Sequence, residues 1–595
     1  MEQELITLGI LFFFALIGGI LASKFKQPIL LGLLLVGALI GPHMLGLVKD
    51  TNIINMMIDF GAILMLFMIG LEFDITKLQK IGLKAIVVGL LKSGITAFIG
   101  FIVGLLLGLG VMASLFIGII LAFSSTVVIV KVLEEREMLK REEVPLLIAV
   151  LIIEDILAVT ALTFFSGIKD KSAGMIGTVQ TLVISMCILV LFYLLFVELI
   201  KPVLAWVLKS TKGEEITAFM ALAMCAGFSY VAYYLHLSPA AGAFLAGSIV
   251  ASLPDAKNFE KVVAPYNLII SSLFFIAVGT LINFVSIKVN IMIILVLVLT
   301  VILTRIFTFS LIVYLFANFK GDKMLFSSMA MLSIGEFALL VAQESQSFNI
   351  GIDLMSISAA IIFITAIMMS LTLNHSDKLY EPTKDSIPWG FRKKLDKFSS
   401  YIKAISEELD LDNKYSKGLQ SNVYSALLAT LAILLTIFGW RRLSGLLLSY
   451  TIENSATYIT AGYFTVLAMI SILLFYFIYK IQKIIKSLAD IFSNATNSRS
   501  IIQSKITVKR AFLGFALFAV GLLWPYAMFL FNLKLYMVTV SFILIGLAIW
   551  QFHKISISMN DNLDITKDNF PNYKKYDYKE FNGASTRSVN QGWKL

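Results

Sequence analysis

The chain has 595 residues, of which 58% are hydrophobic and 14% are charged, and its formal net charge is +10. An average globular domain is about 25% charged, so this composition excludes a water-soluble enzyme, a nucleic-acid-binding protein and a secreted disulfide-linked scaffold. The apolar residues form runs of roughly 18 to 25, the length that crosses a bilayer as a helix. The sequence therefore predicts an all-α polytopic membrane protein.

Apolar runs predict about thirteen membrane spans before residue 374. These spans are expected at 5–22, 29–48, 53–71, 83–109, 112–132, 146–166, 179–199, 216–236, 239–253, 267–284, 290–316, 324–344 and 353–373. The first run follows no basic segment and no convincing cleavage site, so we expect it to be retained as a span.

Lysine and arginine residues gather in alternate loops of this predicted topology. One set of loops holds Lys24, Lys26, Lys77, Lys80, Lys84, Arg136, Lys140, Arg141, Lys201, Lys209, Lys212, Lys257, Lys261, Lys320 and Lys323, whereas the opposite set holds Lys49, Lys169, Lys171 and Lys288. Cytoplasmic loops are enriched in these residues. The pattern predicts a multi-pass protein of the cell membrane with its N-terminus outside, and it explains the positive net charge without a nucleic-acid partner.

The composition of the chain changes after the apolar region at 1–373. Residues 374–420 are rich in charged side chains and predict a cytoplasmic linker, with an amphipathic helix near Phe391–Leu409 that is either a solvated connector or a regulatory element. Residues 421–552 predict C-terminal transmembrane helices of unknown role, and 553–595 predict a polar tail. The four C-terminal apolar runs are 423–440, 458–479, 511–531 and 535–551.

Two adjacent carboxylic acids, Glu154 and Asp155, lie near the middle of the sixth predicted span. A charge at mid-span costs roughly 2.5–3.5 kcal/mol, and the ionised pair about 5–7 kcal/mol, so a functional role is favoured over purely structural carboxylates. Adjacent helical residues project about 100° apart, so the two side chains face different partners. Arg305, inside the eleventh span, stays charged and is the natural partner of Glu154, which leaves Asp155 for an ion. An arginine that extends to the membrane interface is the alternative.

Two predicted spans are interrupted by small or polar residues. These are Ser124, Ser125 and Thr126 in the fifth span, and Ser333, Gly335 and Glu336 in the twelfth. Discontinuous helices place backbone ends near the midplane and bind ions in secondary transporters, although small polar residues also serve ordinary helix packing. The two interrupted spans occupy corresponding places in two halves of the region, which predicts an inverted repeat with two broken crossing helices.

Several stretches resemble the monovalent cation:proton antiporter family 2, which includes Kef-type potassium efflux systems and NapA-like sodium/proton exchangers. The likeness covers about residues 1–373. It rests on "QPILLGLLLVGALIGPHMLGL", "GAILMLFMIGLEFD", "SSTVVIVKVLEEREML", "IIEDILAV", "SLFFIAVGTLINF" and "LSIGEFALLVAQES". The usual Kef-type nucleotide-binding domain is missing, since no G-x-G-x-x-G motif in a βαβ context follows residue 374.

The resemblance implies roles for the singled-out residues. Asp155 matches the aspartate that exchanges a proton for a cation, Glu154 matches the preceding position, and Arg305 matches the basic residue that pairs with that position. The resemblance also makes 124–126 and 333–336 the two unwound crossing segments. Relatives are dimers in which a core domain moves against a dimerisation domain, so we expect a homodimer.

The sequence therefore predicts a secondary active transporter, not an enzyme, that exchanges Na⁺ or K⁺ for H⁺ by alternating access. No cofactor is expected, and no metal other than the transported cation at Asp155; the lipid bilayer is the remaining partner. Two alternatives stay open: a gated K⁺ efflux protein with channel-like behaviour, and a regulatory or assembly subunit with a vestigial transporter core. Because arginine does not give up its proton, we expect only Asp155 to titrate, and we expect the exchange to be electroneutral. The alternative is that Glu154 carries a second proton.

Overall fold

A computed structural model describes residues 2–25, 27–48, 51–72, 75–168, 214–234, 238–252, 256–348 and 350–373, together with 539–551 and scattered residues beyond 424. The predicted span 179–199, the linker 374–420 with its amphipathic helix, most of the C-terminal runs and nearly all of the tail lie outside these described residues. The boundaries predicted for the C-terminal regions therefore stay predictions.

The described part of the chain is almost entirely helical, as predicted. Its helices are α1 (Glu2–Lys24), α2 (Ile29–Ile40), α3 (Thr51–Glu72), α4 (Ile75–Leu106), α5 (Val111–Ala122), α6 (Thr126–Glu135), α7 (Val144–Ile168), α9 (Glu214–Tyr234), α10 (Pro239–Ala251), α11 (Ala256–Thr280), α12 (Phe284–Val289), α13 (Ile291–Leu303), α14 (Ser310–Ile312), α15 (Asp322–Ala330), α16 (Phe337–Ser345) and α17 (Leu354–Thr372). Two π-helical segments, η2 (Thr304–Phe309) and η3 (Val313–Ala317), directly follow α13 and α14, and a 3₁₀ turn, η4 (Gln346–Phe348), follows α16.

Every predicted span except 179–199 coincides with one described helix, with a broken pair of helices or, for 290–316, with the consecutive segments α13, η2, α14 and η3. Eight of the described helices are long and apolar enough to cross a membrane. The second span is shorter than predicted, because α2 ends at Ile40 instead of continuing to 48. The next residue, Gly41, lies so close to α11 that a Cβ atom there would be 2.4 Å from the carbonyl oxygen of Thr280.

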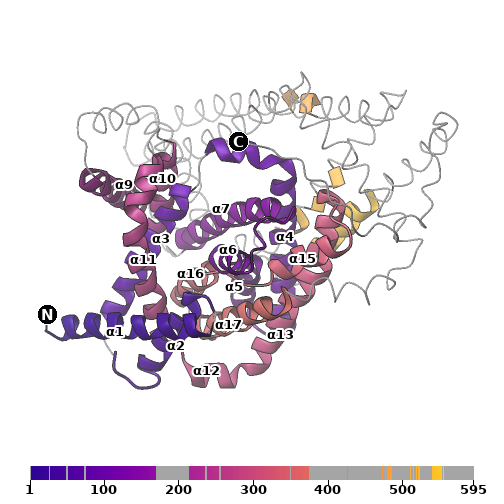
Figure 1. Ribbon diagram of the computed structural model, residues 1–595. Coiled ribbons are helices and arrows are strands. Elements are labelled where there is room, and N and C mark those ends of the chain that lie inside the picture. The colour runs from indigo at the N-terminus through magenta and orange to yellow at the C-terminus, as the bar shows by residue number, and fades with distance from the viewer. Residues whose placement is uncertain are drawn as a thin grey trace, which may run out of the picture.

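The helices form two bundles. The first bundle contains α1, α2, α3, α9, α10 and α11, and the second contains α4 to α7 and α13 to α17 with η2 and η3. Figure 1 shows α3, α9, α10 and α11 on one side and α5, α6, α15 and α17 on the other. Glycine permits close helix packing in the first bundle. A Cβ atom at Gly37 of α2 would lie 2.3 Å from the carbonyl oxygen of Ile276, and one at Gly70 of α3 would lie 2.1 Å from that of Phe244.

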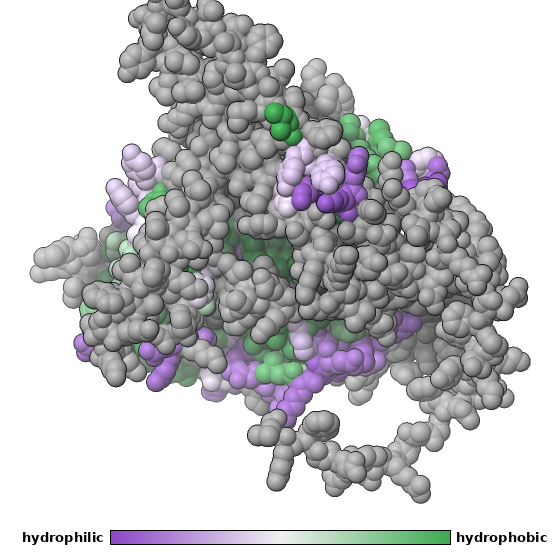
Figure 2. All heavy atoms as spheres, turned by 90° about the horizontal axis from the view of Figure 1, so that it is seen from above, coloured by the Kyte–Doolittle hydropathy of each residue, from purple (hydrophilic) through white to green (hydrophobic). Residues whose placement is uncertain are grey.

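Large apolar side chains remain exposed on several outer helices, as expected of helices that face lipid. Examples are Leu16 of α1, Phe219 of α9 and Met292 of α13, with exposed fractions of 62%, 73% and 73%. The face shown in Figure 2 carries hydrophilic patches near its margins with hydrophobic residues between them.

Two extended segments cross inside the second bundle, where the predicted breaks lie. The chain leaves α5 at Ala122 and re-enters helix at Thr126, and it leaves α15 at Ala330 and re-enters at Phe337. An isolated antiparallel bridge joins Ser124 to Ile334. The structure thus confirms that both spans are broken, and the bridge satisfies backbone groups that the interrupted helices leave unpaired.

Helix α4 packs on both the crossing segments and the C-terminal part of the chain. The ring of Phe98 packs edge-on against that of Phe542, in the helix Thr539–Gln551, with ring centroids 5.8 Å apart. The Cδ1 atom of Leu522 lies 3.2 Å from the Cβ position of Gly94. Gly94 and Phe98 share one face of α4, about 200° around the helix from Lys92, so α4 presents opposite faces to the C-terminal helices and to the crossing segments.

Candidate ion-binding site

The two carboxylates of α7 lie beside the first break and point to different partners. Glu154 is fully buried, and its Oε2 accepts a hydrogen bond of 2.8 Å from the backbone N–H of Ser124. Asp155 is 7% exposed, and its Oδ1 and Oδ2 lie 3.4 Å and 3.3 Å from the donating Oγ1 of Thr126. The structure therefore brings Ser124 and Thr126 of the first break together with the acidic pair, as the adjacent positions of the two carboxylates on α7 allow.

A lysine that the sequence interpretation missed completes this arrangement. Lys92 of α4 is 1% exposed, and its Nζ lies 2.5 Å from Oε1 of Glu154. The ammonium group also donates to the carbonyl oxygen of Ala122 at 3.0 Å and to Oγ of Ser124 at 2.7 Å. The ammonium group therefore makes one ion pair and two hydrogen bonds. A signal was present, because Lys92 is the one charged residue between 85 and 106 in an otherwise apolar run.

Arg305 lies in the π-helical segment η2 and is fully buried. Its Nε donates to the carbonyl oxygen of Met331 at 2.9 Å, its Nη1 to Oγ1 of Thr96 at 3.1 Å, and its Nη2 to the carbonyl oxygen of Leu121 at 3.2 Å. Met331 and Leu121 lie at the ends of α15 and α5, where unpaired carbonyl groups carry partial negative charge. The guanidinium group therefore binds the carbonyl ends of both interrupted helices.

The structure differs here from the predicted ion pair between Glu154 and Arg305. Glu154 forms its ion pair with Lys92. Arg305 instead finds acceptors in backbone carbonyl groups and one hydroxyl. The prediction assumed that a buried guanidinium requires a carboxylate as its partner, but carbonyl groups at helix ends also provide acceptors of the right sign.

The second break supplies a third buried carboxylate. Glu336 is 2% exposed, and its Oε2 accepts a hydrogen bond of 3.1 Å from Oγ of Ser125. The backbone N–H of Ser125 donates to the carbonyl oxygen of Ser333 at 3.0 Å. A Cβ atom at Gly335 would lie 2.7 Å from the carbonyl oxygen of Ser124, so this position requires glycine. The six residues predicted to form the two unwound segments are thus brought together.

Charges and helix ends are matched in this site. Lys92 and Arg305 lie at the carbonyl ends of the interrupted helices, whereas Asp155 and Glu336 lie near the amino ends of α6 and α16. The carbonyl end of a helix carries partial negative charge and favours cations, and the amino end carries partial positive charge and favours carboxylates. Within the described residues, no group of three His, Cys, Asp or Glu side chains is placed to hold a resident metal ion.

Ion pairs outside the site join the start of α15 to the loop between α6 and α7. Arg141 pairs with Asp322 at 3.3 Å, and its guanidinium lies 3.9 Å from the ring centre of Phe326. Lys323 pairs with Glu142, and this hydrogen bond raises the pKa of Lys323. These contacts link the end of the first broken span to the beginning of the second.

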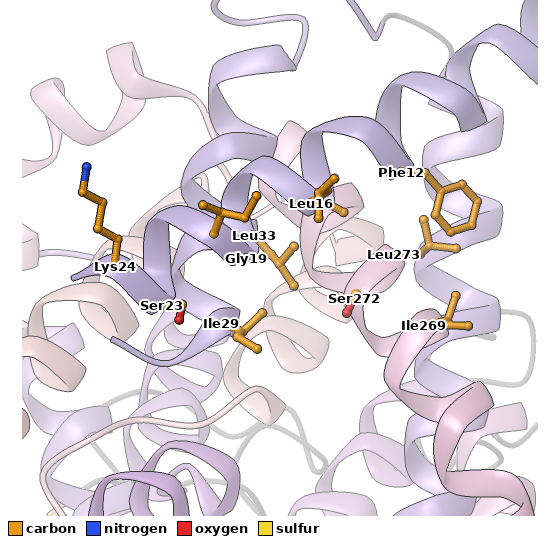
Figure 3. Close-up of a pocket in the computed structure, with 12 residues that line it drawn as sticks. Phe12, Leu16, Gly19, Ser23, Lys24, Ile29, Leu33, Ile269, Ser272 and Leu273 are labelled. Carbon is orange, nitrogen blue, oxygen red and sulfur yellow. The ribbon is translucent and has the colours of Figure 1, made fainter. Parts of the chain in front are cut away.

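A groove of about 810 Å³ lies elsewhere, between α1, α2 and α11 of the first bundle. Figure 3 shows apolar side chains such as Phe12 and Leu273 along this groove and Lys24 at one end. None of the buried charged residues around the breaks lines it. An apolar groove cannot replace the hydration shell of a small cation, so the candidate ion site is the charged cluster in the second bundle.

Comparisons with known proteins agree with this fold. An archaeal sodium/proton antiporter of solved structure, MjNhaP1 from Methanocaldococcus jannaschii, matches with a TM-score of 0.50 and 15% identity over 64% of this chain and 98% of that one. Among curated proteins, a Na⁺/H⁺ antiporter of Enterococcus hirae is 30% identical over 56% of this chain and 87% of its own length.

Other relatives carry potassium in their names. A K⁺ efflux antiporter of Arabidopsis thaliana is 31% identical, and the match spans 46% of this chain and about half, 49%, of the plant protein. The K⁺/H⁺ antiporter subunit KhtU of Bacillus subtilis is 25% identical over 65% of this chain and 97% of its own length. The family model described as "Sodium/hydrogen exchanger, transmembrane" matches residues 11–375, which is more than half of the sequence. The chain therefore belongs to the sodium/hydrogen exchanger family.

Proposed function

We propose that this protein is a secondary active antiporter that exchanges a monovalent cation, Na⁺ or K⁺, for H⁺ at Asp155. The observation that carries this proposal is the buried Asp155 carboxylate beside two interrupted helices. Its relatives include both Na⁺/H⁺ and K⁺ antiporters by name, so family membership supports exchange but leaves the cation open.

One carboxylate is sufficient for the exchange of the two ligands. A nearby cation favours the ionised form of a carboxyl group, whereas a bound proton removes the charge that holds the cation. The two ligands therefore compete for Asp155. The hydroxyl of Thr126 already contacts both carboxylate oxygens, and a hydroxyl oxygen can also serve as a ligand of a partly dehydrated cation. Glu154 is held by Lys92 and by a backbone N–H, which favours a structural role for it.

The division into two bundles supports alternating access. The second bundle carries all the buried charges around the breaks, and the first bundle is held together by close glycine contacts. Movement of the second bundle against the first would change the side of the membrane from which Asp155 is reached. We further propose that the N-terminus is outside and that two copies form a homodimer.

Proton flux in proteoliposomes tests the proposal. The purified full-length protein is reconstituted with a pH-sensitive dye inside, and Na⁺, K⁺, Li⁺ or choline is added outside. Wild-type protein should move protons in response to Na⁺ or K⁺ but not to choline. The Asp155→Asn variant should show no such flux, because an amide neither releases a proton nor balances a cation.

The matched control is Asp322→Asn, which changes the same group at the exposed start of α15. This variant should retain exchange. Normal cation-dependent flux in Asp155→Asn would refute the assignment of Asp155. Cation flux that ignores the opposing proton gradient would instead identify a channel-like efflux protein.

A further inference from the structure

A hydrogen bond between two side chains joins the first bundle to the second. Nε2 of Gln343, in α16, donates to Oδ1 of Asp59, in α3, over 3.2 Å. Helix α3 packs on α10 and α11 within the first bundle, whereas α16 packs on α5, α7 and α17 within the second. The bond therefore connects the two bodies whose relative movement the proposed exchange requires.

Both partners lie on the same side of the crossing segments. Asp59 is exposed and lies about a third of the way along the span Asn52–Leu71. Gln343 lies two turns, about 10 Å, beyond Glu336, where the second break ends. Ionisable side chains at such a depth almost always face protein or water instead of lipid. Asp59 therefore lies at the boundary between the bundles, on the outer side in the proposed orientation.

Another contact between the bundles is of a different kind. Helix α10 of the first bundle also meets α7 of the second, and α10 consists of small and apolar residues, "PAAGAFLAGSIVA". Apolar packing is not directional, so such surfaces can slide against each other with little loss. A hydrogen bond depends on distance and angle, and a displacement of a few Å breaks it. The bond between Asp59 and Gln343 therefore favours one relative position of the bundles over others.

We propose that this hydrogen bond is a gate contact, which holds the bundles in the described position and breaks when Asp155 opens to that side of the membrane. This inference rests on the proposed exchange function and assigns a conformational role to two residues outside the ion site. Gln343 lies on the half-helix that begins at the crossing, so it moves with the ion site, whereas Asp59 stays with the first bundle. A direct contact between the bundles closes the path between them at that point.

Cross-linking tests whether the two residues must separate. Asp59→Cys and Gln343→Cys are combined in a protein that carries Cys187→Ala and Cys225→Ala, and a short bifunctional methanethiosulfonate reagent joins them. The cross-linked protein in proteoliposomes should lose cation-dependent proton flux, and dithiothreitol should restore it. The matched control joins Met56→Cys to Asp59→Cys, two exposed positions one turn apart on α3, and should keep its flux.

Two results of this experiment would overturn the inference. A cross-linked pair at 59 and 343 with the flux of the control pair would show that these positions need not separate. A pair that does not react would show that they do not meet. The proposed function is judged separately, because wild-type protein that exchanges no cation refutes it, whereas a loss confined to the cross-linked pair does not.

Removing the donor tests the same contact without a cross-link. Gln343→Leu deletes the hydrogen bond but leaves the carboxyl group of Asp59 in place. The conformation open to this side should become more populated, so the KM for cation supplied there should fall about threefold, the effect of one ordinary hydrogen bond. Asp59→Asn keeps an acceptor for Gln343, and Gln346→Leu alters an exposed glutamine one turn further along, so neither should lower this KM. An unchanged or higher KM in Gln343→Leu would contradict the gate contact.

Discussion

Replacing Lys92 with methionine would leave a buried carboxylate without its ion pair. Glu154 is fully buried, its Oε1 lies 2.5 Å from Nζ of Lys92, and the ammonium group also holds Ala122 and Ser124. Removing one partner of a buried pair costs about 3–5 kcal/mol, because the remaining charge is uncompensated. Glu154→Gln should be destabilising for the same reason, since it leaves the ammonium group unpaired.

The double substitution Lys92→Met with Glu154→Gln should recover much of this loss. The glutamine amide oxygen can still accept the hydrogen bond from the N–H of Ser124, so a neutral pair replaces the ionic one without losing that acceptor. We expect a coupling energy of about 3 kcal/mol between the two positions, at the upper end of values for residues in direct contact.

The measurement is the free energy of unfolding of the four proteins in mixed micelles with increasing dodecyl sulfate, followed by circular dichroism. The matched control cycle combines Glu154→Gln with Arg305→Met. Its coupling should be smaller, because Arg305 binds carbonyl groups and Thr96 while Glu154 is paired with Lys92. Additive losses in the Lys92 cycle, or a larger coupling in the Arg305 cycle, would refute this reasoning.

Three further predictions follow from the same geometry. Gly335→Ala should lower the thermal unfolding temperature and cation-dependent flux together, because its Cβ atom would lie 2.7 Å from the carbonyl oxygen of Ser124; wild-type behaviour of both would contradict the close approach. An imposed membrane potential should leave the reversal point of exchange unchanged, since one proton replaces one monovalent cation at Asp155; a shift with voltage would show unequal charges. Lys323→Gln should cost at most about 1 kcal/mol of unfolding free energy, because its ion pair with Glu142 is exposed, and a larger loss in the same micelle assay would show that this pair is structurally important.

Much of the fold could be predicted because span length and chain breaks leave local signals. An apolar run of sufficient length has few structural alternatives to a membrane-spanning helix. Hydroxyl groups or glycine within such a run indicate a break in the helix. Ser125 illustrates this, since its side chain accepts a hydrogen bond from the N–H of Val128 and caps the start of α6. The end of α2 at Ile40 left no such signal, because it depends on contact with a distant helix.

The site was predicted less completely, because pairing depends on how each helix is rotated. The depth of Glu154 and Arg305 in their spans was readable, but their relative orientation was not. The π-helical turn η2 changes the direction of the Arg305 side chain relative to a regular helix, and no sequence pattern announced it. Lys92 was visible as an isolated charge in an apolar run, and asking what a buried lysine pairs with would have found it.

The two-sided packing of α4 has a practical consequence for anyone who wishes to isolate a minimal transporter. A chain shortened after residue 373 would keep nearly the whole stretch that the family match covers. It would also remove Leu522 and Phe542, which contact Gly94 and Phe98 on the back of the helix whose front carries Lys92. Detergent or lipid would then have to cover that face of α4. Removing the C-terminal third would therefore remove packing contacts from the helix that positions Lys92 beside Glu154.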